Sequence, residues 1–237
     1  MEYLTLYTSP YSKKRIGKNN DGGYVIVELP GTYDIFLSGG ISDDISFENH
    51  LLSLYPELTC HAFDGTINYT PNGDRIVYHR QNLGNTNNLF LTNLDQYFQN
   101  YNDIFLKIDI EGHEFRLLPV VDLSKVKQLV VEIHSPGDIQ LYPDYFRGLS
   151  DITNNVMFNL LEKINNTHTL VHLHANNGCK MQKINGIDVP HVFELTYIRN
   201  EFVDTRIKNT LPLPTSLDMK NIVGNPDYIL SGFPYSA

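Results

Sequence analysis

Phe105-Leu-Lys107-Ile-Asp109-Ile-Glu111-Gly112-His113-Glu114 is the stretch of this chain that decides its fold. Its first residues form a short apolar strand, and the strand ends in acidic residues and a glycine before a helix begins. The stretch from Gln128 to His134 has the same layout and ends in Glu132 and His134. Because ligands of open α/β sheets bind at the carboxyl ends of the strands, both stretches should direct polar groups at one site. That arrangement indicates an enzyme.

Apolar strand-like segments alternate with helical segments along the rest of the chain. We expect further strands at 25–27, 32–37, 59–65, 75–79, 168–174 and 192–197, and helices at 45–54, 91–101 and 154–165. This alternation predicts an α/β fold with a mostly parallel sheet that has helices on both faces. A chain of 237 residues fits one domain. Within 1–237 we expect an N-terminal arm or lid at 1–30, a core at 31–200 and an irregular, proline-containing tail at 201–237.

The composition of the chain restricts the classes of molecule that it could bind. A formal net charge of -9 argues against nucleic acid, because phosphate binding needs a basic surface. No apolar run reaches the roughly 18 residues of a membrane span, so we expect no membrane partner. The first residues lack a signal-peptide pattern, and with only two cysteines a disulfide scaffold is not expected. We therefore expect a cytoplasmic protein, and the sequence leaves oligomer formation open.

A glycine-containing turn and a later acid suggest a nucleoside site. The turn Ser38-Gly39-Gly40 lies between a strand and a helix, where glycine lets the backbone approach a ligand. Asp64 ends the next strand, where a carboxylate can accept hydrogen bonds from both ribose hydroxyls. Two plain alternatives stay open, a simple strand-to-helix turn and an Asx-turn beside Gly65.

Four residues at the two acid-ended strands could perform chemistry. Strand alternation places Asp109 and Glu111 on one side with Lys107, and places Glu132 with His134. Asp109, Glu132 and His134 could hold a hard cation such as Mg²⁺ or Mn²⁺, or could position an acceptor hydroxyl. His134 could instead be a general base, and Glu132 could merely pair with Lys107. We expect His113 and Glu114 to cap the next helix or face solvent there.

The histidines near residue 174 are a second candidate. His172 and His174 share a face of their strand, and His174 at the strand end is a candidate base. Asn176 and Asn177 could orient a polyhydroxylated substrate. Zinc is disfavoured because neither paired cysteines nor an H-E-x-x-H motif occurs. The chain also lacks a G-x-S-x-G elbow and a Walker A sequence, which argues against serine hydrolases and ATP-driven phosphoryl transfer.

Taken together, these blocks resemble the FkbM-type S-adenosylmethionine-dependent methyltransferases. The matching blocks run in order over roughly residues 20 to 200: Asp21-Gly-Gly-Tyr-Val25; Ser38-Gly-Gly-Ile-Ser-Asp-Asp44-Ile-Ser46-Phe-Glu48; His61-Ala-Phe-Asp64-Gly-Thr66; Leu106 to Glu114; Val130 to His134; and His174-Ala-Asn-Asn177. The chain departs from the family by having Gly65 where proline is usual. Ser38-Gly39-Gly40 also lacks the acid that many methyltransferases carry in this loop.

The resemblance implies a Rossmann-like class I methyltransferase fold, with six parallel strands and one antiparallel strand. It implies that Gly40 holds the methionine part of S-adenosylmethionine, with Ser38, Asp44 and Ser46 close by. Asp64 would hold the ribose, and Asn82 and Leu83 would lie near the adenine. Asp109 would face the transferred methyl group. The residues that would cover the cofactor are Asp21, Gly22 and Tyr24.

Family members typically methylate hydroxyls of sugars or of small secondary metabolites. We therefore expect O-methyl transfer to a hydroxyl of a sugar-containing small molecule, a glycan or a nucleotide-sugar. The hydroxyl proton would be removed by His134 or His174, or made acidic by a cation on Asp109, Glu132 and His134. A nucleotide-sugar would need a basic patch, for which 13–15 is the candidate. The alternatives are a non-catalytic, cofactor-binding partner subunit and a nicotinamide-dependent oxidoreductase.

Overall fold

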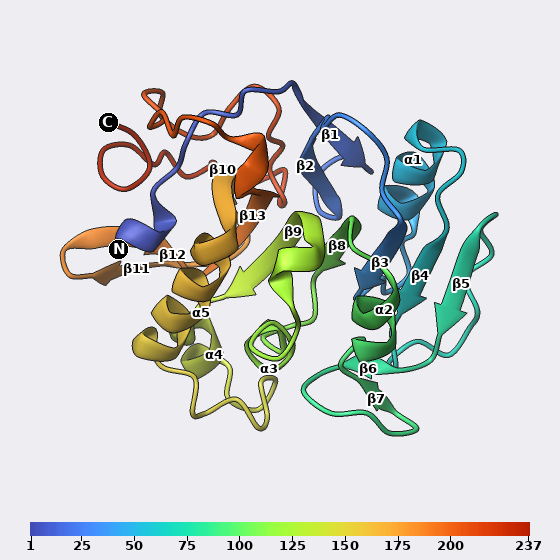
Figure 1. Ribbon diagram of the computed structural model, residues 1–237. Helices are drawn as coiled ribbons and strands as arrows, with labels where there is room; N and C mark the ends of the chain where they lie inside the picture. Colours follow the sequence, from blue (N-terminus) through green and yellow to red (C-terminus); the bar gives the residue numbers. More distant parts are fainter.

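A computed structural model describes residues 1–237, and a seven-stranded sheet runs through its centre (Figure 1). The strand order is β10-β13-β9-β8-β3-β4-β5. The bounds are β3 Ile35–Gly39, β4 Cys60–Phe63, β5 Ile76–His79, β8 Ile104–Ile108, β9 Val126–His134, β10 His168–Ala175 and β13 Val192–Arg199. Strand β13 runs antiparallel to both of its neighbours, and all other adjacent pairs are parallel. This is the arrangement of six parallel strands and one antiparallel strand that the family resemblance implied.

One face of the sheet is covered by helices. They are α2 Asp95–Asn100, α3 Glu114–Leu117, α4 Pro136–Leu141 and α5 Asn154–Thr167. Alternate strand residues such as Leu37, Leu106 and Val131 join them in a cluster of 40 buried apolar residues. Helix α5 contributes through Met157 and three further buried residues at helical spacing, Leu160, Leu161 and Ile164. Burial of this continuous apolar surface provides most of the stabilisation of the sheet.

The opposite face is covered by one helix and a hairpin, where we expected helices alone. Helix α1 spans Ser46–Leu54, and the hairpin pairs β1 Lys13–Gly17 with β2 Gly23–Val27. Both pack on Phe36 and Phe105 in a cluster of 14 buried residues. The Gln128 side chain joins the hairpin to β9, because its amide accepts from Val27 N at 2.6 Å and donates to Val27 O at 2.9 Å. The expected N-terminal arm is therefore a β-hairpin docked on the sheet.

The chain beyond β13 folds back over the polar end of this same face. Asp218 accepts a hydrogen bond from His172, and Asn221 donates to Glu194 at 2.7 Å. The Asn20 amide at the hairpin turn donates to Lys220 O, a contact between residues 200 positions apart. The hairpin turn and the segment 218–227 thus meet above β10 and β13. We call this cover the roof.

Several boundaries differ from the sequence prediction for local reasons. The helix expected at 91–101 begins only at Asp95, because β7 Leu91–Thr92 pairs with β6 Asn82–Leu83. A hairpin of β11 Met181–Ile184 and β12 Ile187–Pro190 was missed. Its turn, Asn185-Gly186, has positive φ at both residues, which is the usual demand of a two-residue hairpin. Single 3₁₀ turns complete the structure at Glu2–Leu4, Leu123–Lys125 and Asn200–Phe202. None of the helices has the length and apolar character required to cross a membrane.

Candidate active site

A cavity of about 510 Å³ opens at the carboxyl ends of β3, β4 and β8. Five of the residues that the family resemblance assigned to the cofactor line it, namely Gly40, Asp64, Asn82, Leu83 and Asp109. The sequence therefore located this cavity through residues that follow three different strands. The remaining lining residues are Ser42, Phe63, Thr66, Leu91, Ile110, Glu111, His113, Tyr145 and Phe146. We call the part around Asp64 the cofactor half, and the part around Glu111 the acceptor half.

Gly40 holds the backbone of the first loop against β8. A Cβ atom at this position would lie 1.6 Å from the Asp109 carbonyl oxygen, and φ is 73°. No other residue fits both this contact and this backbone conformation. The Lys107 ammonium donates to the Gly40 carbonyl at 2.6 Å and lies 3.9 Å from the Asp109 carboxylate. Lys107 thus pairs with Asp109, where the sequence had suggested Glu132.

Asp64 organises the same loop. One of its oxygens accepts from the Ile41 and Ser42 backbone N–H groups at 3.2 and 2.9 Å. The other accepts from Thr66 N and from the Thr66 hydroxyl at 2.8 and 2.6 Å. Burial alone would raise the pKa of Asp64, but these hydrogen bonds outweigh it and hold the pKa below its ordinary value. The carboxylate is therefore charged and fully bonded within the protein.

An apolar wall completes the cofactor half. Phe63, Leu83 and Leu91 line it, and the Phe63 ring stacks on His79 with ring centroids 4.6 Å apart. The Asn82 side chain accepts a hydrogen bond from Gly65 N at 2.9 Å, which fixes the turn after β4. The wall offers a flat apolar slot beside amide and carboxylate groups.

The other residues that the resemblance assigned to the cofactor do not line the cavity. Ser38 is buried and donates to Glu48, and Asp44 accepts from Ser46 N at 2.9 Å at the start of α1. Asp21 accepts from Asn221 at 3.2 Å, and the neighbouring Gly22 lies against Asp44 in the hairpin turn. These residues support the loop and the hairpin.

Tyr24 reaches the site from the hairpin. It is buried, and its hydroxyl donates to Asp109 Oδ2 at 2.7 Å. Burial, together with nearby carboxylates such as Asp109, raises its pKa well above the ordinary value. Tyr24 is therefore a neutral donor that orients Asp109.

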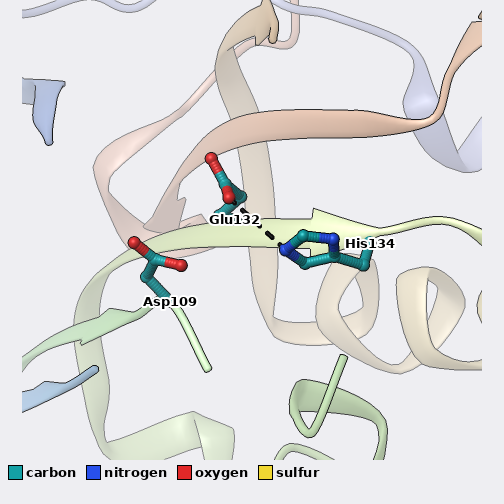
Figure 2. Close-up of side chains that lie close together, drawn as sticks. All are labelled: Asp109, Glu132 and His134. Atoms are coloured by element: carbon teal, nitrogen blue, oxygen red, sulfur yellow. Dashed lines mark ion pairs between the residues drawn. The ribbon is translucent and has the colours of Figure 1, made fainter. Parts of the chain in front are cut away.

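Asp109, Glu132 and His134 converge beside the acceptor half, and Asp109 is the one of the three that lines the cavity (Figure 2). One potential ligand atom from each lies within 4.8 Å of the others. The His134 Nδ1 atom is 2.8 Å from Asp138 Oδ2, so Nε2 points at the other carboxylates. That Nε2 is 3.2 Å from Glu111 and 3.5 Å from Glu132, and neither contact has hydrogen-bond geometry. Close distances without hydrogen bonds leave this atom free for a ligand.

The electrostatics of this cluster change the role expected for His134. Burial would lower its pKa, but Asp138, Glu132 and Glu114 outweigh burial and raise the pKa well above the ordinary value. Burial and the neighbouring Asp109 raise the pKa of Glu132 to about 8. A histidine that already holds a proton at neutral pH is a poor general base. Asp109, Glu132 and His134 could hold a cation, and His134 would release its proton on binding one.

His172 and His174 of β10 lie outside the cavity, beneath the roof. His172 contacts Asp218 at 2.7 Å, and His174 lies 3.3 Å from Glu194 and 3.4 Å from Asp227. Although burial opposes it, Glu194 and the other nearby carboxylates raise the pKa of His174 to about 9. Asn177 donates to Ile222 O at 3.0 Å, so its amide holds the tail. His174 and Asn177 therefore stand apart from the reacting groups.

Sequence reasoning missed several residues of the site. Glu114 was expected at a solvent-facing helix end, but it is fully buried and accepts from His134 N at 2.9 Å. Asp138, Tyr145 and Phe146 were not singled out at all. Glu111 is aimed into the cavity by a left-handed backbone with φ 55°, followed by Gly112 at 84°. The acid-glycine pair after β8 was the available signal for such a turn.

Comparisons with known proteins identify the family of this chain. The family model described as the methyltransferase FkbM domain matches residues 8–149. A search of curated proteins finds no match. Among solved structures, the fibrillarin/Nop5p complex is similar at a TM-score of 0.40 and 10% identity, covering 72% of this chain and 74% of that chain. The plantazolicin methyltransferase BpumL in complex with SAH has a TM-score of 0.37 and 11% identity, covering 72% and 77%. Both scores are low, so the sequence match alone assigns the family.

Proposed function

Because this chain belongs to the FkbM methyltransferase family and is an S-adenosylmethionine-dependent methyltransferase, we propose that it methylates a sugar hydroxyl with the help of a divalent cation. The single observation that carries the proposal is the convergence of Asp109, Glu132 and His134, with a buried imidazole nitrogen left without a hydrogen bond. The nicotinamide-dependent alternative does not fit the family.

The lining of the cofactor half suits S-adenosylmethionine. The adenine would lie against Phe63, Leu83 and Leu91, and the methionine part would lie along the Gly40 loop. The ribose would approach Asp64, one of whose oxygens accepts from the Thr66 hydroxyl. A ribose hydroxyl would take the place of that hydroxyl, since a carboxylate has about four acceptor positions and all are used. The transferred methyl group would then face Asp109 and the acceptor half.

The reaction needs a proton to leave the acceptor. The carbon–sulfur bond of the cofactor would break as the new carbon–oxygen bond forms, which releases S-adenosylhomocysteine, and the hydroxyl proton would pass to water. A sugar hydroxyl is a weak nucleophile, and neither His134 nor His174 is a suitable base at neutral pH. A cation held by Asp109, Glu132 and His134 would lower the hydroxyl pKa and hold the oxygen in place. Oxygen-rich ligands with one imidazole suit Mg²⁺ or Mn²⁺.

The acceptor chemistry favours a neutral sugar over a nucleotide-sugar. Each basic residue of the candidate patch 13–15 already has a partner within the protein. Lys13 donates to Val171 O at 2.9 Å, and the Arg15 guanidinium binds backbone carbonyls of the hairpin turn. The more exposed Lys14 lies 3.9 Å from the Glu28 carboxylate. The net charge of -9 also disfavours a phosphorylated acceptor.

Cation and cofactor binding test this proposal. We would titrate Mn²⁺ into the protein and follow the free ion by electron paramagnetic resonance, and titrate S-adenosylhomocysteine by calorimetry with and without Mn²⁺. We expect one Mn²⁺ site that Glu132→Gln weakens at least about tenfold, as the loss of one ligand interaction of roughly 1.4 kcal/mol requires. Exposed Glu57 provides the matched control, Glu57→Gln. Equal Mn²⁺ binding by both variants would remove the cation from the proposal, and absent S-adenosylhomocysteine binding would remove the cofactor assignment.

A further inference from the structure

An exposed aromatic side chain stands at the edge of the acceptor half. Tyr145 is 65% exposed, yet it lines the cavity together with the buried Phe146. The two rings meet edge to face, with centroids 4.9 Å apart. The Phe146 ring in turn lies 5.2 Å from the His134 ring. The face of Tyr145 is thus presented to solvent within two side chains of the proposed cation ligands.

The segment that carries Tyr145 is firmly held. Segment 142–152 inserts Phe146, Leu149 and Ile152 into the main core cluster. The Arg116 guanidinium binds both carboxylate oxygens of Asp151. Leu149 presses on the turn after β8, where a Cβ atom on Gly112 would lie 2.6 Å from it. The backbone that carries the exposed ring is therefore held in place at the edge of the cavity.

Glu111 stands beside this ring. Its side chain is 53% exposed, and its Oε2 lies 3.2 Å from His134 Nε2. The left-handed conformation of Glu111, with φ 55°, is costly for a residue with a side chain. Strained backbone of this kind is commonly found at functional sites. Here the strained turn, which Leu149 covers, places the Glu111 carboxylate at the cavity.

We infer that Tyr145 and Glu111 form a pyranose-binding subsite that selects the acceptor of the proposed function, on which this inference rests. The apolar face of a pyranose ring stacks on Tyr145, and its outward hydroxyls donate to the Glu111 carboxylate. A single aromatic platform beside acidic groups suits a ring with one apolar face and a polar edge. A planar aromatic acceptor would need apolar contacts on both of its faces, but Asp109, Glu111 and His113 line the rest of this half.

The subsite affects acceptor binding and leaves cofactor binding alone. Tyr145→Ala should raise KM for the acceptor about tenfold or more with little change in kcat, while Tyr145→Phe keeps the platform and nearly the normal KM. Neither variant should alter the affinity for S-adenosylhomocysteine. A merely structural role for Tyr145 would instead lower thermal stability and affect both ligands.

The absence of tryptophan from this chain allows a direct test. Tyr145→Trp places the only tryptophan on the platform, and Tyr142→Trp places one on a 53% exposed position that does not line the cavity. Both proteins would be titrated with the methyl pyranosides of glucose, galactose, mannose and rhamnose, and with 3,4-dihydroxybenzoate, in the presence of S-adenosylhomocysteine and Mn²⁺. We expect a saturable fluorescence change with at least one pyranoside at position 145 alone. Glu111→Gln in the same protein should weaken it about tenfold.

Three results would overturn the subsite. They are no response to any pyranoside, an equal response at positions 142 and 145, and a response to dihydroxybenzoate only. Calorimetry of S-adenosylhomocysteine on the same proteins separates this failure from that of the proposed function. If that ligand binds while pyranosides do not, the subsite fails and the cofactor assignment stands. If it does not bind, the proposed function fails, and the subsite fails with it.

Discussion

The carboxylates at the two ends of the cavity differ in their hydrogen bonding and in the direction of their pKa shifts. Asp64 in the cofactor half accepts four hydrogen bonds from its own loop, and its pKa is low. Glu132, buried beside the acceptor half, has only His134 as an ion-pair partner, at 3.5 Å, and its pKa is raised to about 8. A satisfied carboxylate shapes the protein around it. A buried carboxylate with too few partners destabilises the protein until a ligand supplies the missing charge.

The strongest test of this difference is Asp109→Asn in the acceptor half. Because Asp109 is both a proposed cation ligand and the acceptor of the Tyr24 hydrogen bond, we expect turnover to fall on the order of 10³-fold, as loss of a major electrostatic contribution does. S-adenosylhomocysteine affinity should change much less. The measurement is S-adenosylhomocysteine formation with an accepted pyranoside, and exposed Asp74→Asn is the control. Undiminished turnover would show that Asp109 has no role in the reaction itself and that both halves of the cavity serve only to bind ligands.

Asp64→Asn tests the cofactor half, where the carboxylate has all of its hydrogen bonds. The amide cannot accept from all of the present donors, so the loop loosens and S-adenosylhomocysteine affinity should fall about 10- to 100-fold, equivalent to roughly 1.4–2.8 kcal/mol. Thr66→Val removes one donor and leaves the carboxylate, so we expect its affinity to stay within about threefold of wild type. Calorimetry measures both. Equal losses in the two variants would contradict the exchange of the Thr66 hydroxyl for a ribose hydroxyl.

Asp218 in the roof extends the comparison to acid stability. Burial opposes its charge, but His172, His174 and the Thr215 backbone lower its pKa from 3.8 to about 2. A pKa depressed in the folded state contributes stability above pH 4 that is lost as pH falls toward 2, and the contribution amounts to about 2 kcal/mol. We expect Asp218→Asn to abolish most of this acid dependence in urea unfolding measured at pH 6 and pH 3. An unchanged dependence would mean that Asp218 titrates alike in both states.

The smallest expected effect is a gain in stability. Glu132→Gln removes a buried carboxylate that lacks partners, so the metal-free protein should become more stable by about 1 kcal/mol. The same variant should lose the stabilisation that Mn²⁺ confers on wild type. Thermal unfolding with and without Mn²⁺ measures both. A destabilised variant would show that Glu132 is already satisfied, and the contrast with Asp64 would disappear.

The sequence predicted the sheet well because its strands have strong patterns. The acid-ended stretches before Asp109 and Glu132 lie in neighbouring strands, and their alternation places Asp109, Glu132 and His134 together. The contacts that were not predicted depend on tertiary structure. The docking of the hairpin through Gln128 and the burial of Glu114 leave no local pattern. Tyr145 lies on a segment whose position is set by core residues and by Arg116.

Histidine roles were the least accessible to sequence reasoning. His134 and His174 are titratable residues at strand ends, which made both plausible bases. Their protonation depends on neighbours that fold in from elsewhere, such as Asp138 on α4 and Asp227 in the tail. The charge of each imidazole is therefore a property of the assembled site.

The roof over β10 and β13 also sets an order of events during synthesis of the protein. The Asn20 contact with Lys220 joins residues 200 positions apart, so it cannot form until the segment 218–227 has left the ribosome. Strands β3, β4 and β8 can pair long before that point, because all of them are made early. The polar row of His172, His174 and Glu194 stays open to water in the nascent chain. A ribosome paused before this segment would therefore hold a sheet whose polar end is still uncovered.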